Sequence, residues 1–211
     1  MSRLSKDELA KHRKWLSCWR APAEMAAYVA AVNEKMGSAG FFGQGGIEFL
    51  RDAWLAAEFG RLRQCEDVRL VPEDRQWPDF EARRAEDKEC FECVEAIDPD
   101  RQRGNEYRQV AQQADDVDLH IEDDPVEDWI DRARKAPKAL SKAIAKKVGK
   151  HYPSGASLLV YLNIDEFGIH QVEIEAAMAP AVQPALADFR HVWILWRARL
   201  YGPWSNQVES C

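Results

Sequence analysis

The sequence has no apolar run long enough to cross a membrane. A spanning helix needs about 20 consecutive apolar residues, and the longest apolar runs here are residues 157–164 and 192–196 of a 211-residue chain. The first residues, Met1 to Asp7, also lack the apolar stretch of a secretory signal peptide. We therefore expect a cytoplasmic protein that does not insert into membranes.

Cysteine and histidine are sparse and show no metal-binding spacing. The five cysteines are an odd number at irregular intervals, which favours reduced thiols over a disulfide framework. Cys90 and Cys93 form a CxxC pair, but no second pair or nearby histidine completes a zinc site. The five histidines show neither HxxxH nor HExxH spacing, and a lone histidine is more often structural than a ligand.

Two further catalytic patterns are absent. The glycine-rich segment 37–46 lacks the GxxxxGK[ST] pattern of a phosphate-binding loop, so we interpret it as a flexible connection. Residues 154–157 do not form the GxSxG turn of a serine hydrolase.

The chain has no overall excess of positive charge, but its charges are segregated. It holds 29 Lys and Arg against 36 Asp and Glu, a net charge of −7, which by itself argues against nucleic acid as a partner. Residues 115–131, however, include nine acids and no base, whereas residues 132–150 include eight bases and no acid. Four of these lysines recur at four-residue steps and form one line along a helix: Lys138, Lys142, Lys146 and Lys150. This line could face nucleic acid, the acidic segment or only solvent.

The hydrophobic pattern indicates helices first and alternating strands and helices afterwards. Expected helices cover residues 6–20, 23–36, 47–65, 104–114, 126–150 and 170–187, and expected strands cover 67–71, 79–83, 89–97, 157–164 and 190–197. This order predicts an α/β fold with a mixed central sheet flanked by helices. We expect an N-terminal helical extension at 1–45 and an α/β domain at 46–211.

Three acids along this order could share one hard cation. Glu58 lies on the apolar side of its helix, Asp79 opens a strand, and Glu92 lies in the next strand. A lone carboxylate is costly to bury, and Mg²⁺ is usually held by a few carboxylates and water.

The order of a helical Glu, a strand, Pro-Asp, a strand with Glu, a lysine-rich helix and an apolar strand resembles the PD-(D/E)XK nuclease superfamily, with its restriction-endonuclease-like fold. The resemblance covers about half of the chain, from Glu58 to Ile164. It implies that Asp79 and Glu92 bind Mg²⁺ or Mn²⁺ and that Glu58 joins them. It also implies a nuclease that hydrolyses phosphodiester bonds in DNA.

One motif residue departs from the family. A lysine is expected two residues after the second acid, and Val94 stands there. Glu95 points to the opposite face from Glu92 unless a bulge re-aims it, and a lysine could come from the helix that holds Lys142 and Lys146. Alternatively, catalysis is lost, and the domain is an inactive module that binds nucleic acid or protein.

A basic segment follows the strand that contains Glu92. We interpret Arg101, Arg103, Tyr107 and Arg108 as substrate-binding residues, because arginine forks match phosphate geometry. The alternative is a salt-bridged turn in which the arginines pair with neighbouring acids. The expected partner is nucleic acid, with DNA preferred over RNA, and a homodimer is left open.

Overall fold

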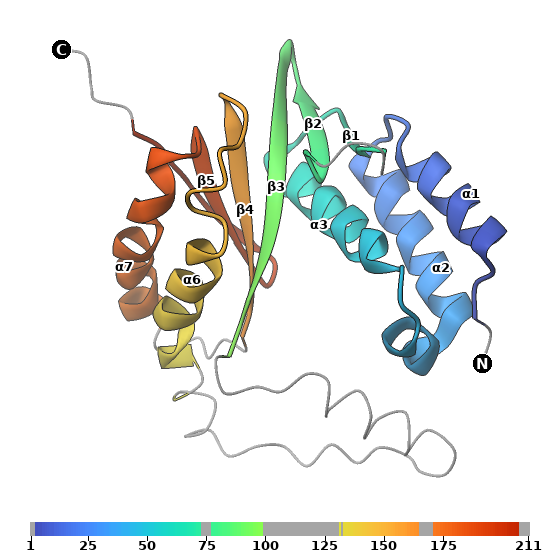
Figure 1. Cartoon of the computed structure of the whole chain (residues 1–211), viewed down its shortest axis with the longest axis horizontal. Coiled ribbons are helices and arrows are strands. Elements are labelled where there is room, and N and C mark those ends of the chain that lie inside the picture. Colours follow the sequence, from blue (N-terminus) through green and yellow to red (C-terminus); the bar gives the residue numbers. More distant parts are fainter. Residues whose placement is uncertain (1–2, 73–76, 99–130, 132, 165–170, 207–211) are drawn as a thin grey trace. The chain divides into compact units, whose positions relative to one another are not determined.

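The computed structural model describes residues 3–72, 77–98, 131, 133–164 and 171–206, and its fold class is α/β, as predicted (Figure 1). The chain divides into two compact units, each described here by itself. Among the described residues, unit 1 holds 3–88, and unit 2 holds those from 89 onward.

Unit 1 contains three helices and two strands: α1 (Lys6–Leu16), α2 (Pro22–Gly43), α3 (Glu48–Arg63), β1 (Asp67–Leu70) and β2 (Phe80–Arg84). β1 and β2 pair antiparallel, with Leu70 opposite Phe80. α3 packs against α2 and both strands, and the fully buried side chains of this core include Leu50, Leu55 and Phe59.

A capping box begins α1. The Ser5 hydroxyl accepts the backbone N–H of Glu8, and the Glu8 carboxylate accepts the backbone N–H of Ser5. Hydrogen bonds to the carboxylate from the backbone N–H of Ser5, from the Ser5 hydroxyl and from Lys35 lower the pKa of Glu8 to about 2. The sequence therefore fixes where the first helix begins through two side chains three residues apart.

α2 is longer than predicted. The glycines of residues 37–46 indicated a connection after residue 36, but the helix continues to Gly43. Glycine costs only about 1 kcal/mol in a helix, and propagation of an existing helix is cooperative, so local composition was overridden here.

Unit 2 contains a mixed sheet with two helices and a short 3₁₀ turn. Its elements are β3 (Asp87–Ile97, in this unit from Glu89), α6 (Ala136–Ala145), β4 (Ala156–Asn163), α7 (Gln171–Val182), η1 (Gln183–Ala187), β5 (His191–Trp196) and β6 (Arg199–Trp204). β3, β4 and β5 run parallel, and β6 returns antiparallel to β5. The middle strand β4 is buried at five consecutive residues, as expected for a strand in the interior of a sheet.

α6 packs on β4 and includes the first part of the basic segment. α6 packs on both β4 and α7, and the two helices lie side by side in Figure 1. Leu140 and Ile144 of α6 are buried, whereas Lys138, Lys142, Lys146 and Lys150 are exposed. The predicted amphipathic pattern is confirmed within α6, but the helix ends at Ala145 and not at residue 150, so Lys146 and Lys150 lie past its last residue.

β6 was not predicted. It contains Gly202 and Pro203, which are unfavourable in strands, and proline is tolerated there because, among the described strands, β6 has a neighbour on one side only. In the described part of the chain, no helix is long and apolar enough to span a bilayer.

Candidate functional site

The clearest acid–base pair of unit 2 joins Glu92 and Lys147. Glu92 lies within β3 and is 8% exposed, and the Lys147 ammonium donates to its Oε1. Burying either charge alone would be costly, so each requires the other. The described residues provide no second hydrogen-bond partner for Glu92, which leaves its Oε2 available to a ligand.

The end of α6 directs Lys147 toward the sheet. The helix closes on short-range bonds, with the backbone N–H groups of Lys146 and Lys147 donating to Ala143 and Ile144. Because Ile144 is buried, the last turn is fixed against the core. Lys147 directly follows Lys146 but does not belong to the exposed line of lysines, and its side chain is 17% exposed.

A small cavity lies between the end of β3 and α6. Its volume is about 90 Å³, enough for about three water molecules. Glu95 lines it and accepts a hydrogen bond from Asn163 at 2.8 Å, and Asp98 lines it and pairs with Lys135 at 3.3 Å. Lys142 and Lys146 also line it, and neither has an ion-pair partner among the described residues. The cavity therefore has two available ammonium groups on one side.

The other two predicted metal ligands lie in unit 1. Glu58 is half-buried on α3 and accepts a hydrogen bond from Arg61, one turn further on, at 2.9 Å. Asp79 is half-buried directly before β2, where its backbone carbonyl accepts the N–H of Val71. Since Glu92 belongs to unit 2, the convergence of the three acids stays a prediction. No three His, Cys, Asp or Glu side chains of the described residues form a ready-made metal site.

A second buried acid, Glu81, has a different environment. It is 4% exposed and accepts hydrogen bonds from Arg69 at 2.6 Å and from Lys88 at 3.1 Å, one on each oxygen. Burial alone raises the pKa of Glu81, but the hydrogen bonds and charges of Lys88 and Arg69 outweigh burial and hold it below its usual value. Both oxygens of Glu81 are thus committed to protein cations.

The predicted substrate-binding residues Arg101, Arg103, Tyr107 and Arg108 lie outside the described residues, as does the acidic segment before residue 131. Cys90 and Cys93 of the CxxC pair lie within β3 as reduced cysteines, in the strand that the sequence predicts for residues 89–97.

The sequence did not single out Lys147, Glu89 or His191. Lys147 belongs to the basic run but is not one of the lysines that recur at four-residue steps. The signal that could have predicted its role is a buried acid in a strand, Glu92, which requires a cation beside it. Glu89 accepts a hydrogen bond from His191 at 2.8 Å across 102 residues of chain. No local pattern reports such a contact.

No protein-family model, curated protein sequence or solved structure matches this chain.

Proposed function

We propose that this protein is a divalent-metal-dependent nuclease whose site includes Asp79, Glu92 and Lys147. The observation that carries the proposal is the buried pair of Glu92 and Lys147. In the superfamily that the sequence resembles, a lysine near the second acid assists the attacking water. In this chain Val94 stands where that lysine is expected. Lys147, which follows α6, donates its ammonium group to the carboxylate of Glu92.

The proposed metal ligands are Asp79 and Glu92, with Glu58 completing or orienting the site. Carboxylate oxygens are the ligands that Mg²⁺ and Mn²⁺ prefer, and Glu92 has one oxygen without a partner in the described chain. Glu58 engages only Oε2 with Arg61, so its other oxygen can take part. A bound metal would lower the pKa of a water nucleophile and stabilise the leaving oxygen.

The basic face of α6 supports DNA as the substrate. Lys142 and Lys146 lie one helical turn apart, are exposed, and have no protein counter-ion among the described residues. Ammonium groups in this arrangement can contact backbone phosphates without reading sequence. Arg101, Arg103, Tyr107 and Arg108 are proposed as further contacts to the substrate.

Cleavage of plasmid DNA and single-stranded DNA tests the proposal, with Mg²⁺ or Mn²⁺ present and after chelation with EDTA. We expect metal-dependent cleavage by the parent protein and a loss of about 100-fold or more in Asp79→Asn, Glu92→Gln and Lys147→Ala. The exposed residues Glu86 and Lys11 provide matched controls, and Glu86→Gln and Lys11→Ala should cleave like the parent. Equal cleavage by the parent and Asp79→Asn would contradict the proposal.

The same pair also favours a second function, an inactive module that binds nucleic acid or protein. The ion pair with Lys147 neutralises the negative charge of Glu92 that would otherwise attract a metal ion. This alternative predicts salt-sensitive DNA binding without divalent ions and without cleavage. Calorimetry that detects tight Mn²⁺ binding in the parent and not in Glu92→Gln would count against it.

A further inference from the structure

A cluster of four polar side chains lies at the start of the parallel strands in unit 2, centred on Glu89. Its Oε1 accepts hydrogen bonds from the Ser157 hydroxyl, from His191 Nδ1 at 2.8 Å and from Trp193 Nε1 at 3.4 Å. The register explains the cluster, because Phe91, Ser157 and His191 lie side by side on β3, β4 and β5. Alternation along β3 then places Glu89 on the same face of the sheet as Ser157 and His191.

The carboxylate of Glu89 fixes the orientation of the His191 ring. With Nδ1 hydrogen-bonded to Glu89, the free ring nitrogen is Nε2, and it has no protein partner within the described segments. The side chain of His191 is 20% exposed and lines a cavity. A carboxylate that orients a histidine in this way is typical of rings that bind ligands or transfer protons.

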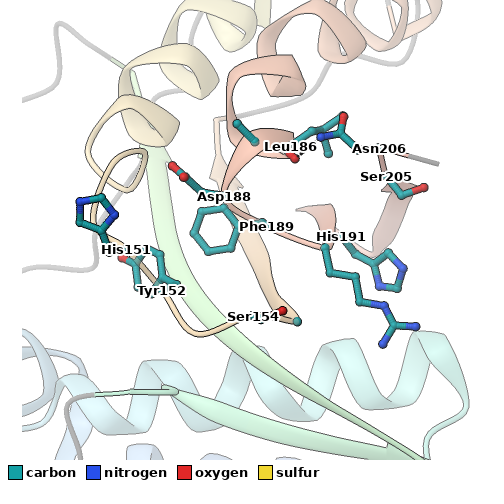
Figure 2. A pocket seen from close by; sticks show the side chains of 12 residues that line it. His151, Tyr152, Ser154, Leu186, Asp188, Phe189, His191, Ser205 and Asn206 are labelled. Atoms are coloured by element: carbon teal, nitrogen blue, oxygen red, sulfur yellow. Dashed lines mark hydrogen bonds between the residues drawn. The ribbon is translucent and has the colours of Figure 1, made fainter. Parts of the chain in front are cut away.

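The cavity is large enough for a small organic ligand, at about 740 Å³. Figure 2 shows the residues that surround it, which come from the loop 151–155, from 186–191 and from 205–206. Internal contacts hold these walls in place. The rings of Tyr152 and Phe189 pack 4.8 Å apart, and Asn206 donates a hydrogen bond to the carbonyl of Leu186.

The charged groups of the cavity favour an anionic ligand. Arg190 lines the cavity with an exposed side chain and has no partner for its guanidinium among the described residues. Asp188 is the acid in the lining, and its carboxylate accepts the backbone N–H of Gly149 at 2.6 Å. The cation without a described partner is therefore Arg190, and the rings of His151 and His191 and the hydroxyls of Ser154 and Ser205 add further hydrogen-bonding groups.

We propose that this cavity binds a small-molecule phosphate monoester, with Arg190 and His191 as the contacts to the phosphate. A phosphate monoester has a charge of about −1.5 to −2 at neutral pH and three strong acceptor oxygens. A guanidinium fork matches these acceptors in charge and in geometry, and a histidine ring adds a hydrogen-bonding nitrogen. Glu89 acts as a positioning residue behind His191. The inference goes beyond the nuclease function, because neither Glu92 nor Lys147 lines this cavity.

Calorimetry on the full chain tests the inference with adenosine monophosphate and inorganic phosphate as probes. Adenosine serves as a control probe that lacks the phosphate, and succinate serves as an anionic control probe that has carboxylates in place of phosphate. We expect both phosphate probes to bind, adenosine and succinate to bind at least tenfold more weakly, and Arg190→Ala and His191→Gln each to weaken phosphate binding by about tenfold or more.

Two control variants isolate the cavity. Arg199 is exposed at the opposite end of the β5–β6 ladder, so Arg199→Ala should bind adenosine monophosphate like the parent. Glu92→Gln should also bind normally, which separates this inference from the nuclease function. Circular dichroism confirms that each variant is folded. The inference is overturned if the parent binds neither phosphate probe, if succinate binds as tightly as phosphate, or if Arg190→Ala binds as the parent does.

Discussion

Glu81 and Glu92 are both buried acids in strands, but their carboxylates differ in what remains free. Arg69 and Lys88 occupy the two oxygens of Glu81, so this residue has no oxygen to offer a ligand. Glu92 has one lysine and one oxygen without a described partner. Since desolvating a carboxylate oxygen is costly unless something binds it, the incomplete pairing at Glu92 is the reason why we propose this acid, and not Glu81, as a ligand-binding group.

We predict that removing Lys147 destabilises the protein more than removing both members of the pair. Lys147→Met leaves the buried charge of Glu92 uncompensated, which should lower the free energy of unfolding by about 3 kcal/mol. The double variant Glu92→Leu/Lys147→Met replaces both charges by apolar groups and should lie within about 1 kcal/mol of the parent. Urea denaturation measures both values.

Lys146→Met is the matched control for this cycle, because Lys146 is exposed and adjacent. Its free energy of unfolding should differ from the parent by no more than about 0.5 kcal/mol. If Lys147→Met were as stable as Lys146→Met, the pair of Glu92 and Lys147 would not be a buried ion pair in solution.

At the scale of elements, a strong hydrophobic pattern predicted helices and strands correctly, whereas local glycine and proline content led to wrong predictions. α6 and β4 were identified because the buried line of Leu140 and Ile144 and the apolar run from Ser157 are unambiguous patterns. β6 was missed because Gly202 and Pro203 obscure a strand that only its pairing with β5 reveals. A strand was therefore predictable where its burial requires a run of apolar residues, as in β4, and not where its sequence is mixed, as in β6.

The candidate site was predictable only in part, because its contacts depend on register. The position of Glu92 within a strand and the exposure of Lys142 and Lys146 follow from local patterns, and the structure agrees with both. The contact between Glu92 and Lys147 spans 55 residues, and that between Glu89 and His191 spans 102. Such contacts depend on how strands align, which the sequence near each residue does not encode.

The packing of α3 leads to a prediction about Gly60. A Cβ added at Gly60 would lie 2.7 Å from Pro22 Cγ and 2.8 Å from Val68 Cγ1, and both neighbours are stiff. Alanine gains about 1 kcal/mol in helix propensity, but overpacking costs about 1 to 3 kcal/mol. We expect Gly60→Ala to lower the thermal midpoint, measured by differential scanning calorimetry.

Gly45→Ala provides the comparison for Gly60→Ala, because a Cβ at Gly45 would have no atom within 4 Å. Its thermal midpoint should stay close to that of the parent. A Gly60→Ala protein more stable than the parent would mean that α2, α3 and β1 pack less closely than the structure describes.

For the whole molecule, the net charge of −7 is a poor guide to partners. The acids are concentrated before residue 132, and the bases follow in one block of 19 residues that includes α6. Exposed charges more than about 10 Å apart are screened at ordinary ionic strength. A phosphate near α6 therefore experiences Lys142 and Lys146 more strongly than any carboxylate more than about 10 Å away, so the net charge by itself does not exclude DNA at this face.

The salt dependence of DNA binding measures how many phosphates this face contacts. Two contacts, from Lys142 and Lys146, contribute about −1.8 to the slope of log K against log salt, which corresponds to about 12-fold weaker binding between 50 and 200 mM salt. Fluorescence anisotropy with Asp79→Asn gives the affinity without cleavage. Lys142→Ala/Lys146→Ala should flatten the slope by about 1.8. The exposed lysines of α1 provide the control, and Lys6→Ala/Lys11→Ala should keep the parent slope. Equal slopes in the two double variants would place the DNA contacts elsewhere on the protein.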